Sequence, residues 1–572
     1  MLMRTRTSLA CLAIAILGAA CHSDATTAPV VAGGPTCGAS TALRLDVNQS
    51  ATLACTSGTF VDLAGGAKYL IVPQFASGGL SSGIFDTPVA YTIGVPTTAA
   101  AATVIGSGVT SRTTVTRAAS PQAQLDSALR ARATRALASP ALRVLGPGRD
   151  LRTSSAIVVP DSGSLRTFNV LTGGLQSFST ALATARLEFV GQNMLLYVDT
   201  LAPANGFSPA QLQAFGQYFD QTLYGIDIAA FGSPTDIDAN GRIIMLLSPS
   251  VNSLTTAAQC KSQGFVAGYF DGTDVTSSPS SNHGEVFYSV VPDPNGTVSC
   301  AHTVTSLLGA VPATFLHELQ HLISFSQHVV VQRGQPEEGW LDEGMSIRAE
   351  ELGSEFFEAK FPPPTGRTSP SQLFPDSSQG FLAGVLNDSY DYLLKPDTAS
   401  VTLHTDADNG FSWRGGDWLL VHWLGDLKGK AVFSRLEHGS VTGIANIEAA
   451  AGEPFGALFG DFSLALWTDS IVGVPRSAIP ARDRFQTRNL RVIYQRVFDT
   501  SGGSLPRAYP LLPTTLSTSA PVVAAMVPGT PVYYILDLRG QSTTTPIQFA
   551  APGGAQFPAT LKPQVSVYRL PN

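Results

Sequence analysis

Apolar residues recur at helical spacing between Val311 and Glu351 and predict two consecutive helices. The apolar face of the first helix comprises Phe315, Leu316, Leu319, Leu322 and Ile323. Pro312 suits the first position of this helix, because an N–H at that position has no partner within the helix. A polar break from Gln332 to Glu338 precedes the second helix, which we expect to end near Gly353.

Short runs of alternating polarity predict strands on either side of these helices. Residues 41–108 contain several such runs between clusters of glycine, serine and proline, and predict a small N-terminal β-sandwich. Strand patterns return in residues 501–572 and predict a small C-terminal β domain. Within residues 154–500 the strand patterns come first, at 165–170, 183–190, 194–198, 243–247, 264–270 and 285–291, and helical patterns follow.

Residues 109–153 differ in composition from both neighbours. The stretch from Gln122 to Leu137 is rich in alanine, leucine and arginine and predicts one helix, with proline and glycine on either side. We interpret the segment as a linker or a processing region. The sequence leaves open whether it is an inert spacer or the place where an inhibitory N-terminal segment is cleaved.

The first 20 residues predict an export signal. Arg4 and Arg6 precede an apolar run from Leu9 to Leu17, which is too short to span a membrane permanently. Cys21 follows Gly-Ala-Ala and resembles the lipid-modified cysteine of bacterial lipoproteins, which makes residues 21–40 a lipoprotein tether; cleavage nearby and release is the alternative. We expect an exported bacterial protein, either an outer-membrane or cell-surface lipoprotein or a secreted one, with lipid at Cys21 as its one membrane contact.

Cysteine usage agrees with export. Apart from one cysteine inside the signal and Cys21, the chain has Cys37, Cys55, Cys260 and Cys300. An even number suits two disulfides in an oxidising compartment, and closeness in sequence favours the pairs Cys37–Cys55 and Cys260–Cys300. A four-cysteine zinc site is the alternative, which the absence of any C-x-x-C pair disfavours.

Composition and charge exclude two classes of protein. The chain is 44% hydrophobic and 13% charged, with 54 glycines and 38 prolines, which suits a strand-rich exported protein with many turns. A net charge of −7 gives no basic surface for nucleic acid. After the signal, no segment approaches 18 uninterrupted apolar residues, so the sequence predicts no membrane-spanning helix.

The first predicted helix carries a metal-binding pattern. His317 and His321 stand four residues apart, so both project from one face and can place two imidazole nitrogens on one cation. Glu318 lies next to them, where it can hold a metal-bound water. Chance rarely supplies H-E-x-x-H in a chain with 9 histidines. The alternative is a pair of partly buried histidines on an amphipathic helix without a metal.

A catalytic zinc site needs a third protein ligand. In the second predicted helix our candidate is Glu343, because it is flanked by the apolar residues Trp340, Leu341 and Met345. Glu350 lies two helical turns later on the same face, where it can accept a hydrogen bond from a ligand imidazole. A solvated helix face is the alternative interpretation of Glu350.

The segments HELQH and WLDEGMSIRAEE together resemble the gluzincin metallopeptidases, and within that clan the hyicolysin-like secreted bacterial peptidases. The resemblance implies an α+β zincin-like metallopeptidase domain over residues 154–500, flanked by small all-β domains, with one Zn²⁺ per chain. It implies His317, His321 and Glu343 as zinc ligands, Glu318 as the catalytic general base and Glu350 as a carboxylate that orients a ligand. Asp342 stands where the family has Asn, and the separation between His321 and Glu343 is longer than in aminopeptidase-type gluzincins, so exopeptidase specificity is not implied.

The resemblance also implies features around the zinc site. Helical patterns after Glu351 predict a second half-domain that closes a cleft. The strand at residues 285–291 lies where zincins keep an edge strand that pairs with an extended substrate. A peptidase needs a donor for the oxyanion that develops on the peptide carbonyl, and Tyr390, Tyr392 and His404 are the candidates.

A second cation site is suggested by Asp236, Asp238 and Asn240, which are followed by Gly241 and resemble the first half of a calcium loop. The twelfth position is Leu247 rather than Glu, so the bidentate ligand of such loops is missing. Ca²⁺ at this loop and a plain Asx-rich turn both stay open.

These observations predict an exported zinc-dependent endopeptidase. It would hydrolyse peptide bonds of protein or peptide substrates with metal-activated water and a glutamate general base. One alternative is a catalytically silent surface lipoprotein or binding module on the same scaffold. The other is a zinc hydrolase that acts on a non-peptide bond.

Overall fold

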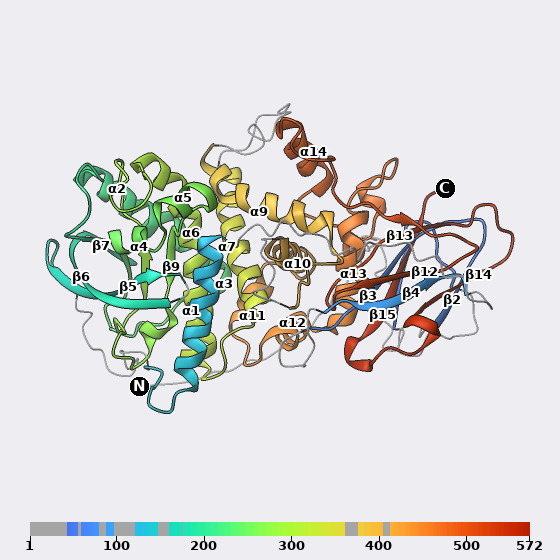
Figure 1. Cartoon of the computed structure of the whole chain (residues 1–572), viewed down its shortest axis with the longest axis horizontal. Helices are drawn as coiled ribbons and strands as arrows, with labels where there is room; N and C mark the ends of the chain where they lie inside the picture. Colours follow the sequence, from blue (N-terminus) through green and yellow to red (C-terminus); the bar gives the residue numbers. More distant parts are fainter. Residues whose placement is uncertain are drawn as a thin grey trace, which may run out of the picture. The chain divides into compact units, whose positions relative to one another are not determined.

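The computed structural model describes residues 43–54, 59–78, 87–96, 120–146, 159–175, 177–360, 376–403 and 412–572. These residues form a mixed α+β structure, and their strands assemble into three sheets (Figure 1). The predictions for Cys21, Cys37, Cys55 and His404 lie outside the described residues. Across the described ranges, no helix has both the length and the apolar character needed to cross a membrane.

A six-stranded sheet lies beside the predicted metal-binding helix, with the strand order β5-β6-β7-β8-β10-β9. Its strands are β5 (Leu165–Gly174), β6 (Ser177–Val190), β7 (Met194–Asp199), β8 (Ile243–Leu247), β9 (Gly268–Phe270) and β10 (Val286–Ser289). β7, β8 and β10 run parallel, and β9 returns antiparallel to β10. Every residue of β8 is buried, as its continuous apolar sequence requires of an interior strand.

The edge strand beside the site is β9 and not β10. We expected the edge at residues 285–291, but all four residues of β10 are buried, and β10 pairs with β8 on one side and β9 on the other. The apolar run Val286–Ser289 therefore belongs to the interior of the sheet, and the shorter β9 takes the edge position.

Helices connect the strands and cover the sheet. They are α2 (Pro209–Tyr218), α3 (Tyr224–Phe231), α4 (Pro249–Ser253) and α5 (Ala257–Gln263). A π-helical turn, Phe219–Leu223, joins α2 to α3. Phe219 in this turn lies edge-on against Phe315, which belongs to a later helix.

The predicted metal-binding helix, α6 (Val304–Phe325), begins earlier than the sequence predicts. Its first turn is capped by Thr303, whose hydroxyl accepts a hydrogen bond from the N–H of Ser306 at 3.1 Å. Pro312 therefore lies inside the helix and not at its first position. Leu307 and Val311 are buried and extend the apolar face of the helix upstream of the proline.

The second helix, α7 (Gly339–Lys360), continues past Gly353, where we expected its end. A Cβ at Gly353 would lie 2.6 Å from Cδ1 of Leu316, so this glycine allows α7 to approach α6 closely and does not terminate the helix. Two downstream helices pack against α7, namely α9 (Asp376–Leu394) and α10 (Ser412–Lys428). The predicted helical half continues with α11 (Ala431–Glu437), α12 (Gly443–Ala451), α13 (Phe455–Thr468) and α14 (Leu490–Thr500).

The N-terminal and C-terminal strands form one β unit, which we expected as two separate domains. The N-terminal strands are β1 (Ser50–Ala54), β2 (Thr59–Leu63), β3 (Lys68–Phe75) and β4 (Val89–Gly94). The C-terminal strands are β11 (Thr514–Thr515), β12 (Val522–Met526), β13 (Tyr534–Asp537), β14 (Thr545–Ala550) and β15 (Pro563–Leu570). They interleave in two sheets, β1-β15-β3-β13-β11 and β12-β4-β14-β2.

The N-terminal strands depend on the C-terminal strands for their pairing. Each of β1 to β4 has only C-terminal strands as its neighbours in the sheets, so the N-terminal segment has no sheet of its own. The two sheets share one apolar core, to which Tyr91, Leu536 and Val567 contribute. The other face of β3 packs on α13, where Ser463 donates a hydrogen bond to Gln74 at 2.6 Å.

One helix comes from the segment interpreted as a linker or processing region. This helix, α1 (Pro121–Ala138), is capped by Ser120, which accepts a hydrogen bond from the N–H of Ala123. Leu125 and Leu129 are buried in the main hydrophobic core. Figure 1 shows α1 in light blue, running across α6 and α7. The helix is therefore packed against the body of the protein.

Candidate metal centre

Two helices bring the predicted ligands together. α6 carries His317 and His321 on one face, and α7 presents Glu343 from its second turn. Gly344 follows Glu343 at the contact with α10, where a Cβ would lie 3.0 Å from the carbonyl oxygen of Asp417. The glycine therefore lets α7 sit deep enough for Glu343 to reach the histidines.

The ligand atoms are spaced as a small tetrahedral ion requires. The two Nε2 atoms of His317 and His321 are 3.2 Å apart. The Glu343 carboxylate lies 3.5 Å from Nε2 of His317 and 3.7 Å from Nε2 of His321. Ligands about 2.0 Å from a tetrahedral zinc ion are roughly 3.3 Å from one another. Three protein ligands at these separations fit zinc with one position left for another ligand.

Carboxylates on α7 orient both imidazoles. The Nδ1 atom of His317 lies 2.8 Å from Glu350, as the sequence predicts. The Nδ1 atom of His321 lies 2.9 Å from Asp342. With Nδ1–H donated to a carboxylate, each ring turns the lone pair of Nε2 toward the shared position between the histidines. Asp342 thus supplies the second histidine with its own carboxylate.

The cluster is buried and strongly polarised. Burial opposes a charge on His317, but hydrogen bonds to Glu343 and Glu350 raise its pKa well above the usual value. Burial would also raise the pKa of Glu343, yet the guanidinium groups of Arg414 and Arg130 hold it well below the usual value. Glu343 is therefore ionised at neutral pH, as a metal ligand must be.

Glu318 has one carboxylate oxygen engaged and one available. Its Oε2 accepts a hydrogen bond from the N–H of Phe270 in β9 at 2.9 Å. Its Oε1 is buried and has no hydrogen-bond partner among the residues that the structure describes. Burial, with the neighbouring Asp126, raises the pKa of Glu318 to about 7. A carboxyl group with such a pKa exchanges protons readily at neutral pH.

Sequence reasoning missed two arginines at this cluster. Arg414 of α10 lies 2.5 Å from Glu343 and 3.2 Å from Nε2 of His317. Arg130 of α1 forms an ion pair with the other oxygen of Glu343. Neither residue carries a local signal, because each reaches Glu343 from a helix that is far away in the sequence. Only the tertiary packing reveals them.

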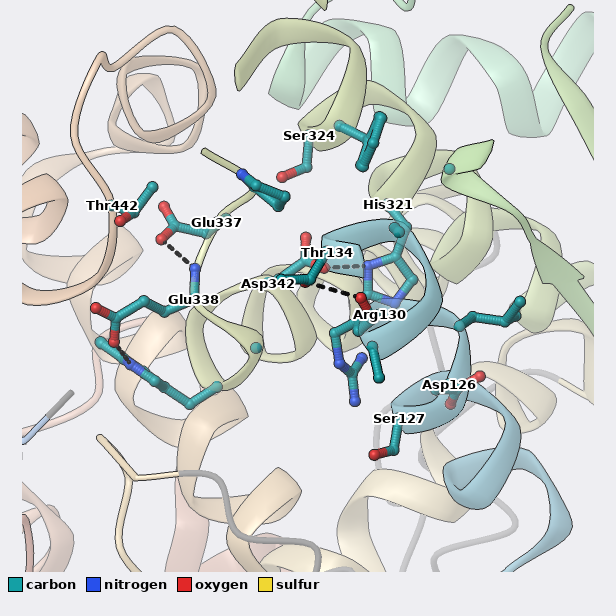
Figure 2. A pocket seen from close by; sticks show the side chains of 18 of the residues that line it. Asp126, Ser127, Arg130, Thr134, His321, Ser324, Glu337, Glu338, Asp342 and Thr442 are labelled. Carbon is teal, nitrogen blue, oxygen red and sulfur yellow. Dashed lines mark hydrogen bonds and ion pairs between the residues drawn. The ribbon is translucent and has the colours of Figure 1, made fainter. Parts of the chain in front are cut away.

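A cavity of about 720 Å³ opens beside the cluster. Glu318, His321 and Asp342 line one part of it, and residues of α1 line another. Figure 2 shows Arg130 and Asp126 on α1 alongside His321 and Asp342. The size of the cavity suits several amino-acid side chains of a ligand.

The tyrosines proposed as oxyanion donors lie elsewhere. Tyr390 and Tyr392 are almost fully buried, and neither lines the cavity beside the metal cluster. The Tyr390 hydroxyl donates a hydrogen bond to the carbonyl of Arg507 at 2.5 Å. Burial raises the pKa of Tyr392 far above its usual range. Both tyrosines lie on α9 and are buried by its packing. The sequence pattern of this helix did not distinguish the face toward the cavity from the face toward the core.

At the proposed calcium loop the structure brings together the carboxylates of Asp236, Asp238 and Glu285. The predicted set was Asp236, Asp238 and Asn240. Asp236 and Asp238 lie close to Glu285, which the sequence analysis did not connect with them. Asn240 instead donates a hydrogen bond to Asp238 at 2.8 Å, and the N–H of Gly241 donates to Asp236. These local bonds are those of an Asx-rich turn. Calcium at this position stays a prediction.

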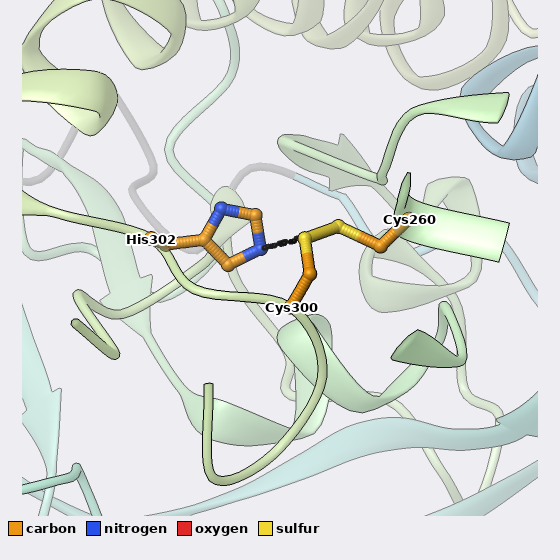
Figure 3. A group of neighbouring side chains, drawn as sticks. All are labelled: Cys260, Cys300 and His302. Atoms are coloured by element: carbon orange, nitrogen blue, oxygen red, sulfur yellow. Dashed lines mark hydrogen bonds between the residues drawn. A yellow bond between two sulfur atoms is a disulfide. The ribbon is translucent and has the colours of Figure 1, made fainter. Parts of the chain in front are cut away.

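A disulfide joins Cys260 and Cys300, the pair that closeness in sequence favours. Figure 3 shows His302 beside it, with Nε2 3.7 Å from the sulfur of Cys300. Because both sulfurs are bonded to each other, neither is available as a thiolate ligand for zinc. The bond ties α5 to the segment that precedes α6 and so supports the start of the metal-binding helix.

Comparisons with known proteins find a distant relative of this chain. No protein-family model matches the chain. Over 171 residues it is 27% identical to the neutral metalloprotease ShpI of Staphylococcus hyicus, a match that covers 29% of this chain. It spans 36% of that relative's length. The match establishes distant homology to a metalloprotease, and the chain carries the His317, His321 and Glu343 cluster of a candidate zinc site.

A solved structure with some similarity is that of an M1 zinc metallopeptidase mutant from Deinococcus radiodurans, bound to a Tyr-Ser-Ala substrate. The identity is 14%, and the similarity covers 61% of this chain and 63% of that chain. The TM-score is 0.24.

Proposed function

We propose that this distant homologue of a metalloprotease is a zinc-dependent endopeptidase on an α+β zincin-like scaffold. The observation that carries the proposal is the meeting of His317, His321 and Glu343 within 4.8 Å at the contact of two helices. The available oxygen of Glu318 lies on the next residue of the same helix as His317. This is the arrangement that metal-assisted hydrolysis requires.

Each residue has a distinct role in the proposal. His317, His321 and Glu343 hold the zinc ion, and Glu350 and Asp342 fix the orientation of the two imidazoles. When bound, zinc supplies a Lewis acid that polarises the scissile carbonyl and lowers the pKa of water. Glu318 accepts the proton of the attacking water on Oε1 and delivers it to the leaving amine.

The edge strand β9 positions the substrate in this proposal. It is the last strand of the six-stranded sheet, and it ends at Phe270, whose N–H is bonded to Glu318. An extended peptide that adds to β9 therefore lies next to the general base. Strand addition uses only backbone groups, which supports action on protein and peptide substrates.

The setting of the enzyme in the cell is also a proposal. An export signal, with lipid attachment at Cys21 or release by cleavage nearby, places the enzyme outside the cytoplasm. The disulfide between Cys260 and Cys300 supports an oxidising compartment. Calcium at Asp236, Asp238 and Asn240 would be a structural addition to the single zinc ion.

The test is cleavage of an unfolded protein such as casein by the ectodomain after Cys21, with zinc content measured on the same samples. Glu318→Gln and a chelated sample should lose cleavage, and zinc returned to the chelated sample should restore it. Glu188→Gln removes a carboxylate from β6, which does not line the cavity, and should cleave like the wild type.

The outcomes separate the alternatives. One zinc per chain with cleavage that depends on Glu318 supports the proposal. Zinc without cleavage of protein, but with hydrolysis of small esters or amides, would replace it by a hydrolase of non-peptide bonds. Zinc with no hydrolysis by the wild type, Gln122→Ala or Arg130→Ala would replace it by a silent binding module.

A further inference from the structure

Helix α1 is hydrogen-bonded to the start of the edge strand β9, to which the proposed substrate would add. The side-chain amide of Gln122 donates to the carbonyl of Gly268 at 2.9 Å and accepts from the N–H of Ala267 at 3.1 Å. The side chain of Gln122 is thus hydrogen-bonded to one backbone N–H and one backbone carbonyl at the beginning of β9. An added peptide strand would need these backbone groups.

The same helix face reaches the metal cluster. Gln122, Asp126 and Arg130 are spaced four residues apart and therefore project from one face of α1. Asp126 lies 3.5 Å from Arg414. Arg130 forms an ion pair with Glu343, the proposed third ligand. One face of α1 thus contacts both the edge strand and the ligand set.

The contact between Arg130 and Glu343 competes with a cation. The two oxygens of Glu343 face two guanidinium groups, Arg130 on one and Arg414 on the other. Glu343 is fully buried, so these charges interact with little screening by solvent. A divalent cation at the ligand cluster would repel Arg130 and would share the carboxylate that holds it.

Other contacts hold α1 in place without involving the ligands. Arg132 donates to Ser280 at 2.9 Å and lies 3.4 Å from Asp271. Arg135 lies on the exposed side of the same helix. These two arginines offer an internal comparison, since only Arg130 contacts the cluster.

We propose that α1 is an intramolecular blocking segment, which occupies the substrate-binding edge and competes with zinc for Glu343. The proposal rests on the proposed function for its substrate, although the competition with zinc does not. Binding of zinc and docking of α1 oppose each other, and a peptide that adds to β9 must displace Gln122. The segment first interpreted as a linker therefore acts as a regulatory element of the site.

The first test is reciprocal and needs no variant. If zinc and α1 oppose each other, zinc must loosen α1 by the same factor by which α1 weakens zinc binding. Hydrogen exchange of the amides of residues 121–138 in the full chain should therefore accelerate about tenfold on addition of zinc, a typical size for coupling between two sites. Exchange that is unchanged or slower with zinc would overturn the proposal.

The second test uses matched substitutions on one helix. Arg130→Ala should bind zinc about tenfold more tightly than the wild type in competition with a chelator. Arg135→Ala, which removes the same charge from the exposed side, should bind zinc as the wild type does. Equal zinc affinity in all three proteins would overturn the competition between Arg130 and zinc.

Cleavage assays then separate this proposal from the proposed function. Gln122→Ala frees the backbone groups of β9 and should lower KM for casein with little change in kcat. An unchanged KM would overturn the blocking of the edge strand. If Arg130→Ala tightens zinc binding and no protein cleaves casein, the competition stands and the endopeptidase assignment fails. If Arg130→Ala leaves the zinc affinity unchanged and the wild type cleaves casein efficiently, the endopeptidase assignment stands and the competition with zinc fails.

Discussion

Replacing Asp342 by asparagine removes the negative charge of this side chain but keeps an oxygen that can accept a hydrogen bond. The oxygen that accepts the Nδ1–H of His321 lies 2.9 Å away, and asparagine can place its carbonyl oxygen there. A charge-assisted hydrogen bond contributes about 2 kcal/mol and a neutral one about 1 kcal/mol. We therefore expect Asp342→Asn to lose about 1 kcal/mol of zinc binding, which is roughly a fivefold weaker affinity.

Alanine at the same position should cost more. Asp342→Ala removes the hydrogen bond altogether, and loss of about 2 kcal/mol corresponds to roughly 30-fold weaker zinc binding. The hydroxyl of Ser346 remains 3.0 Å from Nδ1 of His321 and can accept a hydrogen bond from its N–H, so the loss should stop short of complete failure to bind.

The assay is competition for zinc with a coloured chelator at fixed pH, with Glu338→Gln as the control. Glu338 lines the same cavity but accepts its hydrogen bond from Trp340, so the control removes an equal charge without touching a histidine. Equal weakening by Glu338→Gln would show that overall charge, and not the orientation of His321, governs affinity. Wild-type affinity in both Asp342 variants would refute the assigned role.

Three further predictions test catalysis, packing and ionisation. Glu318→Gln should keep one zinc per chain and lower kcat by about 10²-fold to 10⁴-fold, because the proton acceptor is lost, as zinc analysis and casein cleavage would show. Gly415→Ala should destabilise the protein by about 1–3 kcal/mol, because a Cβ there would overlap the backbone of α9. By contrast, exposed Gly384 has open space around it, so Gly384→Ala should stabilise by about 0.5–1 kcal/mol; thermal unfolding midpoints that move in the same direction for both would contradict this. Burial raises the pKa of Asp483 to about 8, so the folded protein keeps a proton that the unfolded chain releases above about pH 4. That stability is fully present below about pH 4 and is lost as the pH rises toward 8, by at most about 6 kcal/mol. Asp483→Asn should flatten this dependence in denaturant midpoints measured at pH 5 and pH 8, and an unchanged slope would argue against a raised pKa.

The sequence predicted the centre of the site well because that geometry is local. Two histidines four residues apart on a helix must share a face, so His317 and His321 could be paired without a structure. Glu343 followed from its apolar surroundings and from the family resemblance. The role of Asp342 was visible only as a departure from the family pattern, since its bond to His321 depends on how two helices are rotated against each other.

The parts that the sequence did not predict depend on long-range packing. Arg130 and Arg414 reach Glu343 from helices that are distant in the chain, and nothing near them in the sequence indicates a partner. Alternating polarity predicted where most strands lie in the sequence. It could not predict which strands pair with each other, because a period of two residues is common to every half-buried strand. The N-terminal and C-terminal strands were therefore assigned to two domains, although they pair with one another.

The interleaved β unit also fixes the order in which the protein can be completed during synthesis. β4 ends at Gly94, and β12, the first of its two partners to be made, begins at Val522. At about 5–20 residues per second, a ribosome needs roughly 20–90 s to make the intervening chain. Throughout this interval the first four strands expose unpaired edges, which are prone to aggregation unless they are held apart. A chain that terminates before residue 514 leaves all four of them without a partner strand.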